Sequence, residues 1–193
     1  DTVGTGTLTL DFGTVGDDGM GGTTFTVNPE RATQNITIDT AHSSLAGVRD
    51  AINAAKAGVS ASIVNDGSGN RLVLSSNSTG TSNSIRLRVT DNDGDGADAA
   101  GLSKLAYDPA TGGAANMLQA VAPVDAQFKL DGLEIVKASN TVTDVLEGTT
   151  INLLKTNVNA PTTLTIASDT SGIKTSIDAF VKAYNEMIDG VKK

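Results

Sequence analysis

The stretch that decides the fold runs from Ile36 to Ser76, ITIDTAHSSLAGVRDAINAAKAGVSASIVNDGSGNRLVLSS. Apolar residues first alternate with polar ones, which predicts a strand around Ile36 and Ile38. Ser43-Ser44 then precedes apolar positions at helical spacing, so we expect a helix capped by serine and stopped by Gly58. Two further alternating runs flank Asn65 to Gly69 and predict a β-hairpin. The segment is therefore expected to fold as strand, helix and hairpin.

The sequence on either side of this stretch has the same β-type alternation. Residues 5–12 predict a first strand, residues 13–22 a Gly- and Asp-rich loop, and Phe25 with Val27 a second strand. After the hairpin, Ile85, Leu87 and Val89 predict one more strand. Residues 91–117 are rich in Asp, Gly and Ala and predict a loop.

A second β-rich block is expected beyond Pro123. Asp131-Gly132 suits a type I′ hairpin turn between residues 128–130 and 133–135. Residues 143–148 predict a short helical turn, and further strands are expected at 151–153 and 164–166.

The end of the chain changes to a helical pattern with a heptad-like apolar seam. Its members are spaced four and three residues apart: Ile173, Ile177, Phe180, Tyr184, Met187 and Val191. We interpret this seam as a surface for packing on other helices, at the start of a coiled-coil-like stem. An ordinary amphipathic helix that packs on its own domain is the alternative.

The predicted fold class is therefore mainly β with some α. We expect a β-rich domain with one packed helix at 1–122, a second β-rich domain at 123–168, and the start of a helical stem domain at 169–193. Residues 1–15 could instead pair with the second β-block, and the sequence leaves this choice open.

The composition excludes several classes of protein. The 193 residues contain no cysteine and carry a net charge of -8, with a pI near 4.5. Absence of cysteine excludes disulfide scaffolds and thiol nucleophiles. The acidic balance disfavours nucleic acid and anionic membrane surfaces, and no apolar run is long enough for membrane insertion. The chain begins with Asp1 and without a signal-like segment, which predicts an internal fragment.

One motif suggests a metal. Asp91, Asp93 and Asp95, followed by Gly96, match the first half of an EF-hand calcium loop. Position 12 of that loop is Leu102 where a bidentate Glu is required, although Asp98 offers another carboxylate. Calcium is thus a possible ligand and no other cofactor is expected; the alternative is a simple Asp/Gly turn. No catalytic triad or carboxylate pair is distinguishable from turn chemistry, so we do not expect an enzyme.

Three stretches resemble a known family. The run quoted above, with its Ile52-Asn53 pair, resembles the flagellin IN motif of flagellin-related and hook-associated proteins. FKLDGLEIVKASNTVTDVLEGTTINLLKT (128–156) and TLTIASDTSGIKTSIDAFVKAYNEMID (163–189) resemble the flagellar filament cap family, also called hook-associated protein 2. With the linking GLSKLAYDP (101–109), the resemblance covers most of the chain.

This resemblance implies a structural role. Members of the family carry two β-rich domains on a helical stem and form a homo-oligomeric ring at the flagellum tip, outside the cell. The ring promotes folding and insertion of exported flagellin. Export through the flagellar type III apparatus, contact with hook-associated junction proteins and, in some bacteria, adhesion to mucin or host surfaces are implied as well. The alternatives are a calcium-steadied extracellular adhesin module and a flagellin-type or hook-junction filament subunit.

Overall fold

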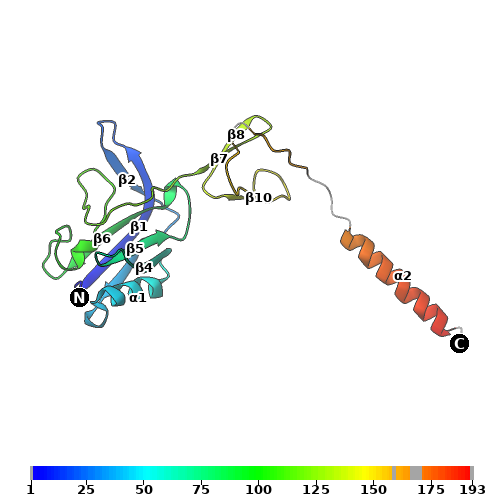
Figure 1. The fold of residues 1–193 in the computed structure, drawn as a ribbon, viewed down its shortest axis with the longest axis horizontal. Coiled ribbons are helices and arrows are strands. Elements are labelled where there is room, and N and C mark those ends of the chain that lie inside the picture. Colours follow the sequence, from blue (N-terminus) through cyan, green and yellow to red (C-terminus); the bar gives the residue numbers. More distant parts are fainter. Residues whose placement is uncertain (1, 158–159, 166–170, 192–193) are drawn as a thin grey trace. The chain divides into compact units, whose positions relative to one another are not determined.

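The computed structural model describes residues 2–157, 160–165 and 171–191. Its main sheet has four antiparallel strands and is built around β1 (Gly6–Asp17). β6 (Ser84–Asp91) pairs with one edge of β1. β3 (Gln34–Ile38) and β2 (Thr23–Val27) pair with its other edge, one after the other. The other three strands of this sheet all pair with the one long central strand β1 (Figure 1).

β1 is longer than the alternation predicted. The predicted loop at residues 13–22 is wrong at its start, because Gly13 to Asp17 pair with Val27 to Thr23. A Cβ at Gly13 would collide with the backbone oxygen of Thr26. Glycine is therefore needed at this position, because β1 and β2 approach each other closely there. Pairing with β2, β3 and β6 places β1, and with it residues 6–15, in the sheet of the first block and not with the second block.

The predicted helix is α1 (Leu45–Ala55). Ser44 is its N-cap, as expected, and its side chain accepts a hydrogen bond from the backbone N–H of Gly47. The predicted stop is wrong in position, because the left-handed capping residue is Lys56 (φ 49°) and not Gly58. Val48 and Ile52 are the buried residues of the helix.

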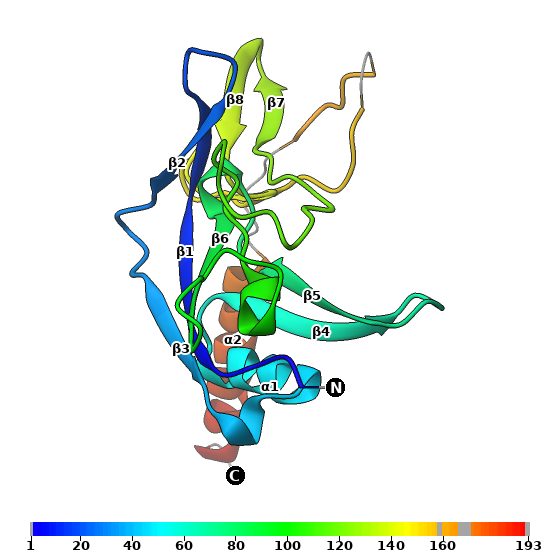
Figure 2. The ribbon, with the colours of Figure 1, turned by 90° about the vertical axis from the view of Figure 1, so that its left-hand side faces the viewer.

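The hairpin also formed as predicted, from β4 (Val59–Asn65) and β5 (Asn70–Ser76). α1 contacts β4, and in Figure 2 the hairpin extends away from the β1 sheet. The core lies between the apolar face of the sheet, α1 and the base of this hairpin. Its large members that are almost fully buried are Leu8, Leu10, Phe12, Ile38, Val48, Ile52, Leu87 and Leu102.

The segment 91–117 is more ordered than the predicted loop. It contains the short 3-10 helix η3 (Gly101–Leu105), in which Leu102 and Ser103 are fully buried. Tyr107 forms β-bridges with Leu87 and Ala115, so the segment folds back on β6. Two other short 3-10 helices are η1 (Thr40–His42) and η2 (Thr81–Asn83).

The second block consists of two short hairpins. β7 (Ala126–Leu130) pairs with β8 (Leu133–Lys137), and β9 (Thr141–Val142) with β10 (Ile151–Asn152). Asp131 and Gly132 both have positive φ (49° and 83°), which confirms the predicted I′-type turn. Residues 143–148 form bends and a turn, so the predicted helical turn is wrong. Leu164 is not in a strand, and Ile166 lies outside the described residues.

By packing, the chain divides into Asp1–Leu154 and Lys155–Lys193. The second unit contains the C-terminal helix α2 (Ser171–Val191). The mainly β fold class with a helix in the first block and a C-terminal helix is confirmed; the boundaries near 122 and 168 stay predictions. Neither helix of the described residues has the length and apolar composition for crossing a membrane.

Candidate functional site

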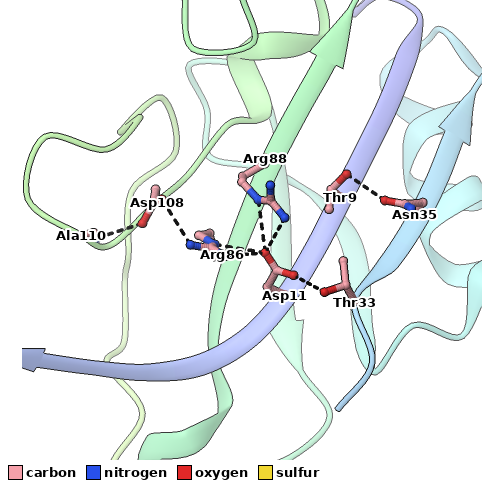
Figure 3. Close-up of polar contacts among 8 residues, drawn as sticks. All are labelled: Thr9, Asp11, Thr33, Asn35, Arg86, Arg88, Asp108 and Ala110. Atoms are coloured by element: carbon pink, nitrogen blue, oxygen red, sulfur yellow. Dashed lines mark hydrogen bonds and ion pairs between the residues drawn. The ribbon is translucent and has the colours of Figure 1, made fainter. Parts of the chain in front are cut away.

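A polar network occupies the face of the main sheet opposite the core (Figure 3). Asp11 faces Arg86 in the register of β1 and β6, and both Arg86 and Arg88 donate to its Oδ2 atom, at 2.8–3.2 Å. Thr33 donates to the other oxygen at 2.6 Å. Arg86 also lies 3.8 Å from Asp108. One carboxylate thus ties together β1, β6 and the chain entering β3.

The electrostatics of this network follow from its burial. The side chain of Asp11 is 1% exposed, that of Arg86 17% and that of Arg88 54%. Burial alone would raise the pKa of Asp11, but the hydrogen bonds from Thr33 and Arg86 and the positive charges of the two arginines outweigh it and lower the pKa. Asp11 is therefore a charged anchor of the sheet.

Sequence reasoning missed this network. Two signals were available: Asp11 stands among the apolar residues of a strand, and Arg86 and Arg88 share one face of another strand by their period-two spacing. The two signals become one site only when the strands are known to be neighbours.

The Ile52-Asn53 pair has a specific structural role. Ile52 is 2% exposed in the core, and Asn53 reaches the outer edge of β4. Its Nδ2 donates to the backbone oxygen of Ala61 at 2.9 Å, and its Oδ1 accepts from the backbone N–H of Ala61 at 2.8 Å. The amide of Asn53 thereby satisfies the two groups that a neighbouring strand would bind, and it closes this edge of the hairpin.

The acidic loop brings together a different set of three carboxylates from the set that the sequence predicted. Carboxylate oxygens of Asp91, Asp93 and Asp98 lie within 4.8 Å of one another, whereas Asp95 is not part of this group. The Asp95 side chain accepts from the N–H of Ala97 at 3.2 Å and serves the turn. Asp98 takes the place of Asp95 because the chain bends within the loop.

The charges in the loop repel one another. The pKa of Asp91 is lowered, chiefly by a hydrogen bond from Ser103 Oγ, 2.8 Å from Oδ2. The backbone N–H of Asp95 lowers the pKa of Asp93, but the hydrogen bond with Asp91, some loss of solvation and the charges of Asp91 and Asp98 outweigh it and raise the pKa. Oδ1 of Asp91 is buried without a hydrogen-bond partner among the described residues.

The acidic loop does not have the complete ligand set of an EF-hand. Leu102, at the position of the bidentate Glu, is fully buried in the core, so the second half of such a loop cannot form. Three carboxylates remain that could approach a cation. Calcium at this loop stays a prediction.

The predicted helix seam lies along α2. All six side chains are more than half exposed: Ile173 64%, Ile177 57%, Phe180 70%, Tyr184 52%, Met187 56% and Val191 80%. The rings of Phe180 and Tyr184 stack with centroids 6.5 Å apart. On another face, Lys174 pairs with Asp178 at 2.9 Å and Lys182 with Glu186 at 3.9 Å. The helix is thus amphipathic, with an exposed apolar face.

Two family models match the chain. Residues 21–78 match the flagellin hook IN motif, and residues 124–193 match the C-terminus of flagellar hook-associated protein 2. The first match includes the Asn53 contact, and the second includes β7 to β10 and α2.

Curated relatives have the same description. The B-type flagellar hook-associated protein 2 of Pseudomonas aeruginosa PAO1 is 44% identical over 161 residues, which are 79% of this chain and 33% of that protein. The flagellar hook-associated protein 2 of Salmonella typhimurium LT2 is 36% identical over 155 residues, 80% of this chain and 31% of that protein. The chain thus spans about a third of the length of the curated relatives it matches.

Solved structures agree with the sequence comparisons. The D1-D2-D3 domains of the flagellar cap protein FliD from Escherichia coli match with a TM-score of 0.71 and 37% identity, over 97% of this chain and 56% of that one. The D2-D3 domains of FliD from Serratia marcescens match with a TM-score of 0.62 and 33% identity, over 86% of this chain and 89% of that one. The chain therefore belongs to the flagellar hook-associated protein 2 family.

Proposed function

We propose that this chain is the part of a filament cap subunit that carries the two β-rich domains and the start of the helical stem. The resemblance to cap proteins over most of the chain supports this role. Its work is assembly, without catalysis: subunits form a homo-oligomeric ring at the flagellum tip, outside the cell. Beneath this ring, flagellin delivered by the flagellar type III apparatus folds and inserts.

The single observation that carries the proposal is the exposed apolar face of α2. Burial of one large aliphatic or aromatic side chain is worth about 1.5–3 kcal/mol, so six such residues along one helix strongly favour a partner surface. Their alternating spacing of four and three suits another helix. Since the chain spans about a third of its relatives, we infer that stem helices from the remaining length of the same subunit cover this face.

The β-rich domains then form the plate of the cap or its outward surface. Flagellin and the hook-associated junction proteins are the protein partners that this role requires. Adhesion to mucin would be a second use of the same outward surface, for which the Ser-, Thr- and Asn-rich exposed strands offer hydrogen-bonding groups.

Immunogold electron microscopy of intact cells tests the location. With antibody against these 193 residues, we expect label only at filament tips. Label along whole filaments would indicate a flagellin-type subunit instead, and label on the cell body away from flagella would indicate an adhesin.

A matched pair of variants tests the stem. In the full-length protein, Ile177→Asp places a charge in the apolar face and should abolish tip labelling and motility. Asp178→Asn, on the neighbouring charged face, should leave both intact. Normal tip labelling with Ile177→Asp would contradict the stem packing without affecting the assignment to the tip.

A further inference from the structure

Met20 is an exposed apolar side chain at the tip of a hairpin. It lies in the turn between β1 and β2, at the end of these strands farther from α1 (Figures 1 and 2), and is 89% exposed. Nothing in the packing of the described chain requires a large apolar residue there.

The tip is narrow and held in one shape. Asp18 Oδ1 accepts hydrogen bonds from the backbone N–H groups of Met20 and Gly22, both at 2.8 Å, and Asp17 Oδ1 accepts from Gly19 at 2.6 Å. Gly19 and Gly21, on either side of Met20, have positive φ and no side chain, so Met20 projects without a bulky neighbour next to it in the sequence. Because these hydrogen bonds hold the backbone of the tip, less backbone entropy is lost on binding than from a mobile loop.

A groove elsewhere on the same unit could receive such a side chain. It has a volume of about 160 Å³ and lies beside β5 and β6, with Leu74, Ile85 and Met117 among its apolar walls. Leu118 and Val121 also line it while being 90% and 83% exposed. A cavity of about 150 Å³ accommodates a benzene molecule, so an unbranched methionine side chain fits this volume.

The charges at the two places are complementary. The carboxylates of Asp17 and Asp18 bind only backbone N–H groups within the described chain, so the tip is acidic. At the groove, Arg31 donates to Asn83, a residue of the groove wall, at 2.6 Å and stacks on Phe12. No carboxylate pairs with Arg31 among the described residues.

We propose that the Met20 tip of one copy docks in the groove beside Leu118 of a second copy, with Asp17 and Asp18 facing Arg31. The Met20 tip and the groove lie on different parts of the surface of one copy. The contact between two copies is therefore heterologous and propagates head to tail, as a closed ring requires. This inference rests on the proposed function for the existence of a ring, and it names the contact between neighbouring subunits.

These 193 residues contain no cysteine, and once any cysteine elsewhere in the full-length protein is replaced by serine, the contact can be tested directly by disulfide formation. Full-length Met20→Cys protein is mixed with full-length Leu118→Cys protein and oxidised with glutathione disulfide. We expect a covalent heterodimer. Ser68→Cys, exposed at the turn of the other hairpin, replaces Leu118→Cys as the matched control and should give none.

Sedimentation of the full-length protein supplies a second readout. Met20→Ala should raise the dissociation constant of the assembly about tenfold. Arg31→Gln should weaken it too, whereas Arg49→Gln, which removes an arginine already paired with Asp50, should not.

The outcomes separate the two proposals. An assembled protein that forms no Met20–Leu118 disulfide, or links Met20→Cys equally well to Ser68→Cys, would overturn the docking and leave the cap role standing. A full-length protein that is monomeric at every concentration would overturn the ring itself.

Discussion

Asp11 and Arg86 face each other in the register of β1 and β6, and Arg86 Nη2 donates to Asp11 Oδ2 at 2.8 Å. Loss of hydrogen bonds to a charged group costs about 1.5–3 kcal/mol, and Arg86 keeps Asp108 at 3.8 Å as a second acidic neighbour. We therefore expect Asp11→Asn to lower the free energy of unfolding by that amount in urea denaturation. Asp50→Asn, which removes an exposed partner of Arg49, is the control and should have little effect. Equal effects of the two variants would contradict an anchoring role of Asp11.

The same pair predicts a pH dependence. The pKa of Asp11 is lower in the folded protein than its ordinary value of about 3.9, so its charged form stabilises the fold above that pH. This contribution is lost as the pH falls below about 3.9 and through the lower pKa of the folded state. The difference in unfolding free energy between the parent and Asp11→Asn should therefore shrink from pH 6 to pH 2. A constant difference over that range would show that the charge of Asp11 has no part in it.

Asn53 should be needed to close the edge of β4. Asn53→Ala leaves the N–H and C=O of Ala61 without the two hydrogen bonds at 2.8 and 2.9 Å, which should cost about 1–3 kcal/mol in thermal or urea unfolding. Amide hydrogen exchange at Ala61 should accelerate more than exchange within β1. Asn92→Ala, which removes one exposed hydrogen bond to Thr5, is the control with a smaller expected loss. Unchanged protection of Ala61 would refute the capping role.

Two leucines distinguish core from surface in the segment after β6. Leu102, which lies within the predicted loop at 91–117, is fully buried, whereas Leu118, just beyond that loop, is 90% exposed. Leu102→Ala should destabilise the fold by about 2–5 kcal/mol, and Leu118→Ala should change stability by less than about 0.5 kcal/mol. Similar unfolding midpoints for the two variants would mean that η3 is not part of the core.

The calcium prediction can be tested together with the geometry of the loop. If a cation binds, calcium should raise Tm relative to chelator, because a ligand of the folded state stabilises it. Asp98→Asn should then abolish the response, and Asp95→Asn should leave it intact, because Asp98 and not Asp95 lies with Asp91 and Asp93. An unchanged Tm in the parent protein would reject calcium at this loop.

Much of the local structure was determined by the sequence. The serine cap, the helical spacing of Val48 and Ile52, and the Asp131-Gly132 turn each depend on residues within a few positions of one another. The period-two alternation of β1 places Leu8, Leu10 and Phe12 on one face of the strand, and all three are buried in the structure. Such short-range signals are sufficient for the helix, the hairpins and the fold class.

Only the tertiary structure decided which distant segments meet. Alternation shows that Asp11, Arg86 and Arg88 each occupy a particular face of a strand, but not that their strands are neighbours. The replacement of Asp95 by Asp98 in the acidic loop, the contact of Asn53 with Ala61, and the burial of Leu102 were hidden for the same reason. Periodicity encodes the direction of a side chain relative to its own backbone, whereas pairing and chain reversal depend on the packing of the whole core.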